Sequence, residues 1–145
     1  MPITVKKIAL WRKEVENTPG VLAGALEPLA AAGADFQILM GYRYSGDPSK
    51  AAIELYPVTG KKLLAAARTA GLQPTSIPTL LIEGDNKPGL GADFTWGIAD
   101  AGVNLAFFVA QVVGRKYSAV IGFESEEDAR KAANLIKKAT TGKKK

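Results

Sequence analysis

One turn sequence occurs twice in this chain, and each copy opens an apolar stretch. The first copy is Asn-Thr-Pro-Gly at 17–20, and the second is Asn-Lys-Pro-Gly at 86–89. When these two turns are aligned, both Pro-Gly pairs coincide and Gly33 falls on Gly102. Matched alanines carry little weight in an alanine-rich chain, but matched Asn, Pro and Gly residues at fixed offsets do. The pattern predicts that the chain is an internal duplication.

Each turn is predicted to start a helix. We expect Pro19 at the first helical position, where its missing N–H costs nothing, and Thr18 as the N-cap. Gly33 suits the left-handed position that ends a helix, and Gly102 does the same in the second copy. Both halves are therefore expected to begin with a strand, this turn and an apolar helix.

The order of elements is the same in both halves. Runs rich in β-branched and aromatic residues predict strands, and periodic apolar stretches bounded by glycine predict helices. Each half follows the order β-α-β-β-α, which lacks one strand of the common β-α-β-β-α-β unit. The expected strands are 3–15, 34–44, 51–57, 77–83, 103–112 and 117–123, and the expected helices are 19–32, 60–70, 88–101 and 125–138.

Two long segments can supply the missing strands. Residues 72–83 would end the first unit and begin the second, and residues 3–15, their equivalent by repeat, would close the second unit. The predicted fold class is α+β: two ferredoxin-like β-α-β-β-α-β units with antiparallel sheets, helices on one face of each sheet and shared or exchanged long strands. We expect units at 1–71 and 72–139 and a disordered lysine-rich tail at 140–145.

The positive charge of the chain is concentrated at its C-terminal end. The 145 residues include 19 Lys and Arg against 14 Asp and Glu, a formal net charge of +5. Five of the lysines lie within 137–145, and the rest of the chain has equal numbers of basic and acidic residues. A nucleic-acid-binding protein of the same shape is an alternative. The neutral body and the lack of a basic-aromatic strand motif argue against it.

The composition argues against an enzyme. Because the sequence has no Cys and no His, the usual nucleophile–base pairs and most transition-metal sites are absent, and we expect no cofactor and no metal. Asp85, Asp93 and Asp100 are too widely spaced for a cation-binding loop. No long uncharged apolar segment or signal-peptide core is evident, so a cytoplasmic location is the default expectation.

The duplicated pattern resembles tandem ACT domains. In both halves the first helix opens with Asn-x-Pro-Gly-apolar and is followed by Gly, a small apolar residue, Asp or Asn, and another apolar residue. The resemblance extends over residues 3–139. It implies a regulatory or sensor protein that binds a small ligand, most often a free amino acid, and has no chemistry of its own. We also expect a homodimer and an unidentified enzyme or regulator as partner.

The resemblance implies which residues contact the ligand. In this family two domains often lie side by side through their second strands, with ligands between them. One site would combine the turn at Asn17 with Asn104, and the other would combine the turn at Asn86 with Asp35. The expected ligand-binding residues are Asn17, Pro19, Gly20, Val21, Leu22, Asp35, Asn86, Pro88, Gly89, Leu90 and Asn104. Some family members have a His just before the turn, where this chain has Val15 and Gly84, so any contact from that point is lost or apolar.

The chemistry of these residue types agrees with an amino-acid site. Free N–H groups at a helix start suit a carboxylate, and an Asn or Asp oxygen can accept a hydrogen bond from an ammonium group. Gly20 and Gly89 allow a ligand to approach the backbone closely. Because Asp35 carries a full negative charge that Asn104 lacks, its site is expected to favour cationic groups.

Simpler interpretations exist for the same residues. Asn17 and Asn86 can be ordinary turn residues, and Asp35 and Asn104 can merely follow helix ends. Aromatic residues on strands are more often core than stacking platforms, and Trp96 is expected in the core or between helices. A scaffold or oligomerisation domain with degenerate ligand sites is a further alternative, and it predicts an oligomer that responds to no metabolite.

Overall fold

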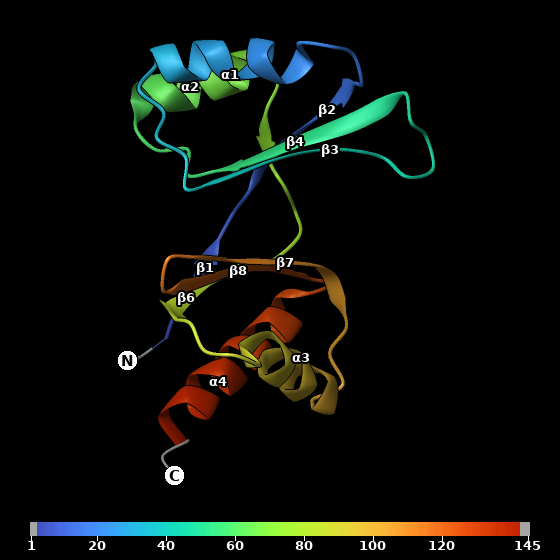
Figure 1. Ribbon diagram of the computed structural model, residues 1–145. Coiled ribbons are helices and arrows are strands. Elements are labelled where there is room, and N and C mark those ends of the chain that lie inside the picture. Colours follow the sequence, from blue (N-terminus) through green and yellow to red (C-terminus); the bar gives the residue numbers. More distant parts are fainter. Residues whose placement is uncertain (1–2, 143–145) are drawn as a thin grey trace. The chain divides into compact units, whose positions relative to one another are not determined.

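The computed structural model describes residues 3–142, and the chain forms two compact units (Figure 1). The first-repeat unit is Ala9–Ser76 and contains the turn at 17–20. The second-repeat unit combines Met1–Ile8 with Ile77–Lys145 and contains the turn at 86–89. Each unit has its own four-stranded antiparallel sheet and its own hydrophobic core.

The first-repeat unit is a complete β-α-β-β-α-β arrangement. Its sheet has the strand order β3-β4-β2-β5, and Figure 1 shows both helices on one face of that sheet. The central pair of strands aligns Trp11 with Leu55 and Val15 with Ala51. The elements are β2 (Trp11–Glu16), α1 (Val21–Ala31), β3 (Ile38–Arg43), β4 (Lys50–Tyr56), α2 (Lys61–Thr69) and β5 (Gln73–Pro74).

The second-repeat unit obtains its fourth strand from the beginning of the chain. Strand β1 (Thr4–Ile8) pairs antiparallel with β6 and places Ile8 opposite Thr79, and the sheet order is β1-β6-β8-β7. Lys7 on β1 also forms an ion pair with Glu126 at the start of α4. The other elements are β6 (Thr79–Asp85), α3 (Leu90–Asp100), β7 (Leu105–Val113), β8 (Lys116–Phe123) and α4 (Glu126–Gly142).

Both long segments are therefore divided between the two sheets, which confirms the expected exchange of strands. Residues 3–15 contain β1 and most of β2, and residues 72–83 contain β5 and most of β6. As a result, the chain passes from one unit to the other between residues 8 and 9 and again between residues 76 and 77, whereas the expected boundary lies between residues 71 and 72. The physical reason is strand pairing. Strand β1, from the first long segment, pairs with β6, and strand β5, from the second long segment, pairs with β2.

The lysine-rich end is partly helical. Helix α4 extends to Gly142, so residues 140–142 belong to a helix and not to the predicted disordered tail. Lys and Ala are good helix formers, which allows the helix to continue beyond the core residue Ile136. Residues 143–145, the rest of the predicted tail, lie outside the described residues.

The two Pro-Gly pairs form turns and are not the first helical residues. Gly20 has φ 84° and ψ −4°, Gly89 has φ 86° and ψ 0°, and the N–H of Val21 donates to the Thr18 carbonyl at 3.2 Å. These values define a type II turn, with Pro in its second and Gly in its third position. The predicted roles of Pro19 and Thr18 are therefore wrong, because left-handed Gly20 is the N-cap and the helix begins at Val21.

The helix ends follow the prediction. Gly33 has φ 91° and Gly102 has φ 76°, both in the left-handed region. After Gly33, the N–H of Ala34 donates to the Leu29 carbonyl at 3.1 Å, which is the bond of a Schellman motif. The same motif closes α3, so the two repeats share both ends of their first helix.

Each core lies between the helices and one face of the sheet. On α3, Phe94 and Ile98 are buried, at the spacing of one helical turn. Trp96 lies on the outer side of the same helix and is 69% exposed, so the expectation of a core or interhelical position is wrong. In the other unit, Leu29, Ile53 and Leu55 are buried in the equivalent layer.

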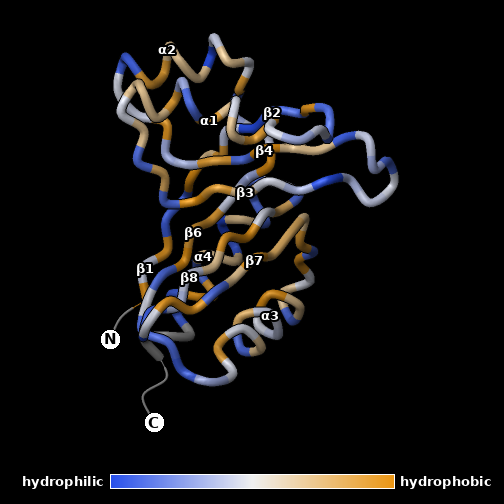
Figure 2. Tube along the Cα trace, turned by 45° about the horizontal axis from the view of Figure 1, so that its top comes forward, coloured by the Kyte–Doolittle hydropathy of each residue, from blue (hydrophilic) through white to orange (hydrophobic). Residues whose placement is uncertain are grey.

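Strand β7 ends the second sheet within the described part of the chain. It is hydrophobic over most of its length (Figure 2). Val109, Val112 and Val113 are exposed on it. An exposed apolar edge strand is a place where another chain can pair.

Candidate functional site

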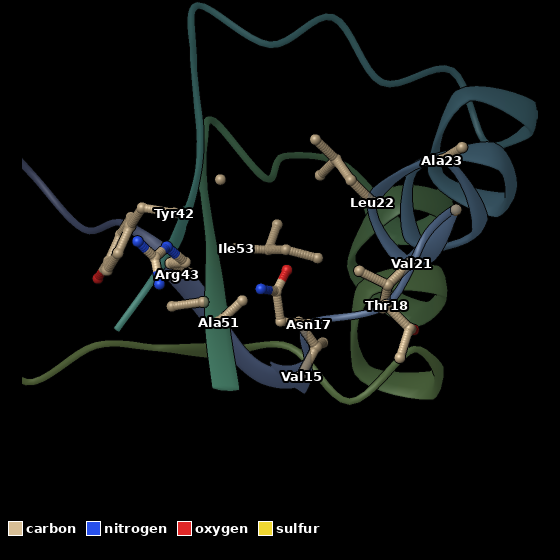
Figure 3. Close-up of a pocket in the computed structure, with 13 residues that line it drawn as sticks. Val15, Asn17, Thr18, Val21, Leu22, Ala23, Tyr42, Arg43, Ala51 and Ile53 are labelled. Carbon is tan, nitrogen blue, oxygen red and sulfur yellow. The ribbon is translucent and has the colours of Figure 1, made fainter. Parts of the chain in front are cut away.

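A pocket lies beside the N-terminal end of α1 in the first-repeat unit (Figure 3). Its volume is about 400 Å³, within the range of sites that hold small molecules. One wall is the leading turn with the first turn of α1, and the other comes from β2, β3 and β4. The lining residues are Val15, Asn17, Thr18, Gly20, Val21, Leu22, Ala23, Gly41, Tyr42, Arg43, Ala51, Ala52 and Ile53. We call this the α1 pocket.

The start of α1 offers free backbone donors. The N–H of Val21 is used by the turn, and the N–H of Gly24 donates to the Gly20 carbonyl at 2.9 Å. Leu22 and Ala23 lie between them, where N–H groups at a helix start have no intrahelical acceptor. Within residues 3–142 no side chain caps this end, and the first turn contains no acidic residue. The helix start therefore favours an anionic ligand group.

Asn17 is held in place by the loop that follows β3. Its backbone N–H donates to the Ser49 carbonyl at 2.8 Å, and its Nδ2 donates to the Pro48 carbonyl at 2.9 Å. With the nitrogen fixed in this way, the carboxamide oxygen points into the pocket toward Ile53 (Figure 3). This oxygen can accept a hydrogen bond from an ammonium or hydroxyl group.

The sheet side of the pocket is apolar. Val15 on β2 is paired with Ala51 on β4, and Ile53 is the next residue of β4 on the same face. A Cβ on Gly41 would lie 3.3 Å from Cδ2 of Leu22, so glycine on β3 lets Leu22 approach the sheet closely. This wall is suited to a small hydrocarbon side chain.

Arg43 is the charged side chain among the lining residues. It follows Gly41 by two positions on β3, and it therefore shares the face of the sheet that Gly41 turns toward α1. The register places it opposite Ala51. Arg43 forms no ion pair within the described residues. A guanidinium group here adds to the attraction of the helix start for a carboxylate.

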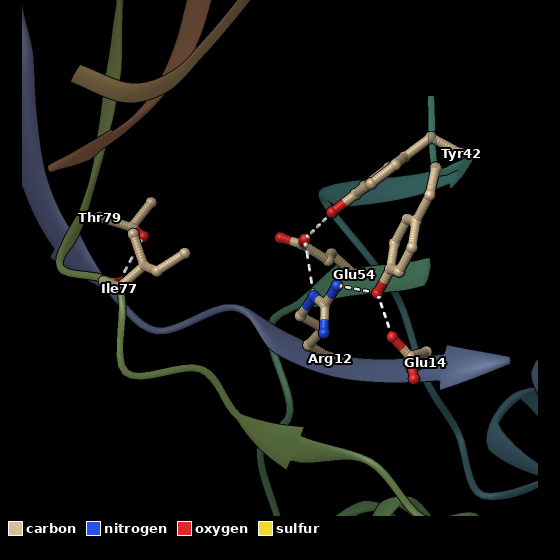
Figure 4. Close-up of polar contacts among 7 residues, drawn as sticks. Arg12, Glu14, Tyr42, Glu54, Ile77 and Thr79 are labelled. Atoms are coloured by element: carbon tan, nitrogen blue, oxygen red, sulfur yellow. Dashed lines mark hydrogen bonds and ion pairs between the residues drawn. The ribbon is translucent and has the colours of Figure 1, made fainter. Parts of the chain in front are cut away.

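Tyr42 connects the pocket to a polar network on the other face of the sheet (Figure 4). Its hydroxyl donates to Oε2 of Glu54 at 2.6 Å, and Nε of Arg12 lies 3.3 Å from the same oxygen. Arg12 also donates to the Tyr44 hydroxyl, which donates to Oε2 of Glu14 at 2.7 Å. Burial and the bond to Glu54 raise the pKa of Tyr42 above its ordinary 10.0. At neutral pH the Tyr42 hydroxyl thus remains a donor that anchors β3.

Four of the predicted contact residues line the α1 pocket, namely Asn17, Gly20, Val21 and Leu22. Pro19 shapes the turn between them. Asp35 is exposed and lies beyond the opposite end of α1. Within the first-repeat unit, Asp35 and the leading turn therefore do not form one site.

The remaining predicted residues belong to the second-repeat unit. Asn86, Pro88 and Gly89 form the equivalent turn before α3, and Asn104 is exposed just before β7. Leu90 is 5% exposed and belongs to the core. The proposed pairs of Asn17 with Asn104 and of Asn86 with Asp35 each take one residue from each unit, and both pairs stay predictions.

Sequence reasoning missed the strand residues of the pocket. Arg43, Tyr42 and Gly41 are consecutive on β3, and Ala51 and Ile53 lie opposite them on β4. Because strand side chains alternate between faces, one signal was available: Gly41 and Arg43 lie two apart at the end of a predicted strand. The sequence does not reveal which face of that strand meets the turn.

The described residues show no metal or membrane features. No group of three or more His, Cys, Asp or Glu side chains that could hold a metal occurs within residues 3–142. In the same range, no helix has the length and apolar character needed to cross a membrane.

Comparisons with known proteins find similarity in structure only. No protein-family model and no curated protein sequence matches the chain. Protein BT0572 from Bacteroides thetaiotaomicron matches with a TM-score of 0.73 and 14% identity over 92% of this chain and 98% of that chain. The ligand-free regulatory subunit of aspartate kinase from Thermus thermophilus matches with a TM-score of 0.62 and 16% identity over 96% of this chain and 97% of that chain.

A third match agrees with these two. The regulatory subunit of aspartate kinase from Thermus flavus has a TM-score of 0.61 and 18% identity, and the match covers 97% of both chains. At such identities the likeness concerns the fold. It covers nearly the whole of each chain, and it confirms the α+β fold with two β-α-β-β-α-β units that the resemblance to tandem ACT domains implies.

Proposed function

We propose that this protein is a non-catalytic regulatory module that binds a free amino acid in the α1 pocket. The proposal depends on one observation: free helix N–H groups, Arg43 and the Asn17 carboxamide oxygen border the same small pocket. Donors and a cation complement a carboxylate, and the carboxamide oxygen complements an ammonium group. The fold similarity to regulatory subunits of aspartate kinase supports a regulatory role.

The proposed ligand lies along the leading turn. Its carboxylate accepts hydrogen bonds from the N–H groups of Leu22 and Ala23 and faces Arg43. Its ammonium group donates to the Asn17 oxygen, which Pro48 keeps oriented by holding the nitrogen. Its side chain rests on the apolar sheet wall. A volume of about 400 Å³ that is also open to solvent favours a small or medium aliphatic amino acid over a large aromatic one.

A thermal-unfolding screen against the twenty amino acids tests this function. A ligand present at about 100 times its dissociation constant adds about 2.7 kcal/mol and raises Tm by several degrees. The shift should be lost in Asn17→Ala and kept in Asn86→Ala, the equivalent change in the other repeat. A flat screen with a cooperatively folded protein would contradict the proposal and would favour the scaffold alternative.

Further expectations about contact residues, signalling and location belong to the same proposal. Asn104 is kept as a candidate ligand residue of the α1 pocket, and Asn104→Ala should weaken binding if Asn104 completes this site. Asp35 is expected at the Asn86 turn and takes part only if that turn also binds a ligand. The signal would pass to an enzyme or regulator through a change in the populations of two conformations. The proposed location is the cytoplasm, and fractionation of cells that express the protein would check it.

We also propose that the protein is a homodimer that pairs through β7. The support is the exposed apolar edge formed by Val109, Val112 and Val113. Sedimentation of the wild type should give a dimer, and Val109→Lys should give a monomer because a charge blunts edge pairing. Leu39→Lys, a change at another exposed apolar strand residue, is the control. A monomeric wild type would contradict this part.

A further inference from the structure

The register of the two sheets identifies the residue that takes the place of Ala51 in the other repeat. In the first-repeat unit, Val15 on β2 is paired with Ala51 on β4. In the second-repeat unit, Gly84 on β6 is paired with Tyr117 on β8. The alignment of the two turns places Gly84 on Val15. Tyr117 therefore occupies the position of Ala51, which lines the α1 pocket.

The side chain of Tyr117 lies at the start of α3. It is 6% exposed, and its ring packs edge-on against Phe94, with 5.8 Å between ring centroids. Its hydroxyl oxygen lies 3.4 Å from where a Cβ on Gly91 would be. Gly91 aligns with Leu22, which lines the α1 pocket. The phenol thus occupies the space that corresponds to the α1 pocket.

The hydroxyl of Tyr117 is buried without compensation. It has no hydrogen-bond partner within residues 3–142, and burial raises the pKa of Tyr117 above its ordinary 10.0. A buried polar group without a partner is costly, and phenylalanine would avoid this cost. The ring stabilises the core by its packing against Phe94, and the hydroxyl extends to the helix start near Gly91.

The other determinants of an anion site are also missing beside α3. Val112 is paired with Tyr117 as Arg43 is paired with Ala51, so an apolar residue replaces the guanidinium group. The first turn of α3 contains Asp93, whereas the first turn of α1 contains no acidic residue. Asp93 both satisfies the helix dipole and repels a carboxylate.

We propose that Tyr117 is a built-in plug that closes the second copy of the site, so that each chain takes one amino-acid ligand, at α1. This inference rests on the proposed function for the α1 pocket. Its structural part does not, because a plug can be removed and replaced without knowledge of the natural ligand. Tyr117 is accordingly a residue that determines site occupancy and does not contact the ligand.

The structural part is tested with 4-methylphenol, the small molecule that corresponds to the side chain of tyrosine. Tyr117→Ala should remain folded with a lower Tm, and 4-methylphenol should bind the vacated space and raise that Tm by several degrees, as small apolar molecules fill engineered cavities. The wild type and Tyr117→Phe should show no such rise. A folded Tyr117→Ala that gains nothing from 4-methylphenol would overturn the plug. If Tyr117→Ala does not fold by itself, 4-methylphenol should restore its folding, and a chain that stays unfolded with 4-methylphenol would overturn the plug.

The occupancy part is tested with ¹⁵N-labelled full-length protein and a mixture of the twenty L-amino acids. In the wild type the amide signals of Leu22 and Ala23 should shift, and those of Gly91 and Ala92 should not. Shifts at Gly91 and Ala92 in the wild type would overturn the inference. If no signal shifts, the proposed function fails and with it the occupancy part, while the 4-methylphenol arm still decides whether Tyr117 is a plug.

Discussion

The two repeats share a backbone and differ in the side chains that face it. In both, a left-handed glycine follows proline before the helix, with φ 84° at Gly20 and 86° at Gly89. In both, the turn Asn donates its backbone N–H at 2.8 Å to a residue just before the third strand, Ser49 in one case and Arg115 in the other. Yet the α1 pocket is open, and the equivalent space beside α3 holds Tyr117.

This difference shows which part of the motif sets binding. The turn creates free N–H groups, and it does so equally in both repeats. The strands opposite the turn decide whether a ligand can reach them: Ala51 leaves space and Tyr117 fills it, and Arg43 adds a cation where Val112 adds none. A matching turn therefore predicts a matching backbone and not a matching site.

The largest expected effect comes from copying the plug into the open site. Ala51→Tyr should lower the affinity for the amino acid found in the thermal screen by more than about 100-fold, because the ring would fill the pocket. Isothermal titration would measure it. Ala51→Ser, which changes polarity with little change in size, is the matched control. Binding that survives Ala51→Tyr would show that the ligand lies elsewhere.

The next largest effect is expected on the other face of the sheet, where Arg12 is paired with Glu54. The equivalent pair in the other repeat is apolar: Leu81 and Val120. Arg12→Leu should lower the free energy of unfolding by about 2 kcal/mol, because it leaves the Glu54 carboxylate buried without its cation. Denaturant unfolding would measure the change.

The matched control is the double variant Arg12→Leu/Glu54→Val, which copies the apolar pair. It should recover much of the lost stability, because two well-packed apolar residues avoid the cost of a buried charge. A double variant that is less stable than Arg12→Leu would contradict this explanation of the network.

A smaller effect is expected when the charged residue of the site, Arg43, is exchanged for the apolar residue of the other repeat. Arg43→Val copies Val112 and should weaken amino-acid binding by about tenfold, since a charged hydrogen bond is lost at an exposed position. Val112→Arg, the reverse change, should not create binding at α3 because Tyr117 still occupies the space. Isothermal titration of both variants against the wild type is the check, and an unchanged affinity in Arg43→Val would remove Arg43 from the site.

The smallest expected effect concerns the hydroxyl of Tyr117. At pH 7, Tyr117→Phe should raise the free energy of unfolding by about 1 kcal/mol, because it removes a buried hydroxyl that has no partner. A fall in the free energy of unfolding would show that the hydroxyl makes a stabilising bond. Denaturant unfolding would measure it, with Tyr56→Phe in the other unit as control.

The same hydroxyl predicts a dependence on alkaline pH. Because burial raises the pKa of Tyr117 above 10.0, the folded state keeps a proton that the unfolded chain releases first. The stability from this group is therefore present below pH 10 and is lost as pH rises through the folded-state pKa. Tyr117→Phe should lose less Tm than the wild type between about pH 9 and about pH 11.

The fold was predictable because its signals are local and repeated. Proline and glycine favour particular backbone conformations, so the duplicated turn, Gly33 and Gly102 place two helices at defined positions. Each half lacks one strand of the common unit, and this predicts the exchange of strands β1 and β5 between the two sheets. The N-cap prediction is wrong because Gly20, in the left-handed conformation, completes the turn and places the start of the helix at Val21. The predicted position of Trp96 is wrong because the side of α3 on which Trp96 lies depends on the residue at which the helix begins.

The site was only half predictable. The turn residues Asn17 and Gly20 carry a sequence signature, and they line the pocket. Arg43 and Ala51 carry none, because their importance arises from strand pairing between residues distant from the turn. Tyr117 would be read as an ordinary core aromatic without the register that places it opposite Gly84. Side chains that lie opposite one another on neighbouring strands can be predicted only when the register of the strands is known.

The most direct test of the account is the stoichiometry of amino-acid binding. Isothermal titration of the wild type with the amino acid selected by the thermal screen should give one site per chain, abolished by Asn17→Ala and unchanged by Asn86→Ala. Two sites per chain, or binding that depends on Asn86 and not on Asn17, would contradict the claim that the α1 pocket is open and its repeat is closed.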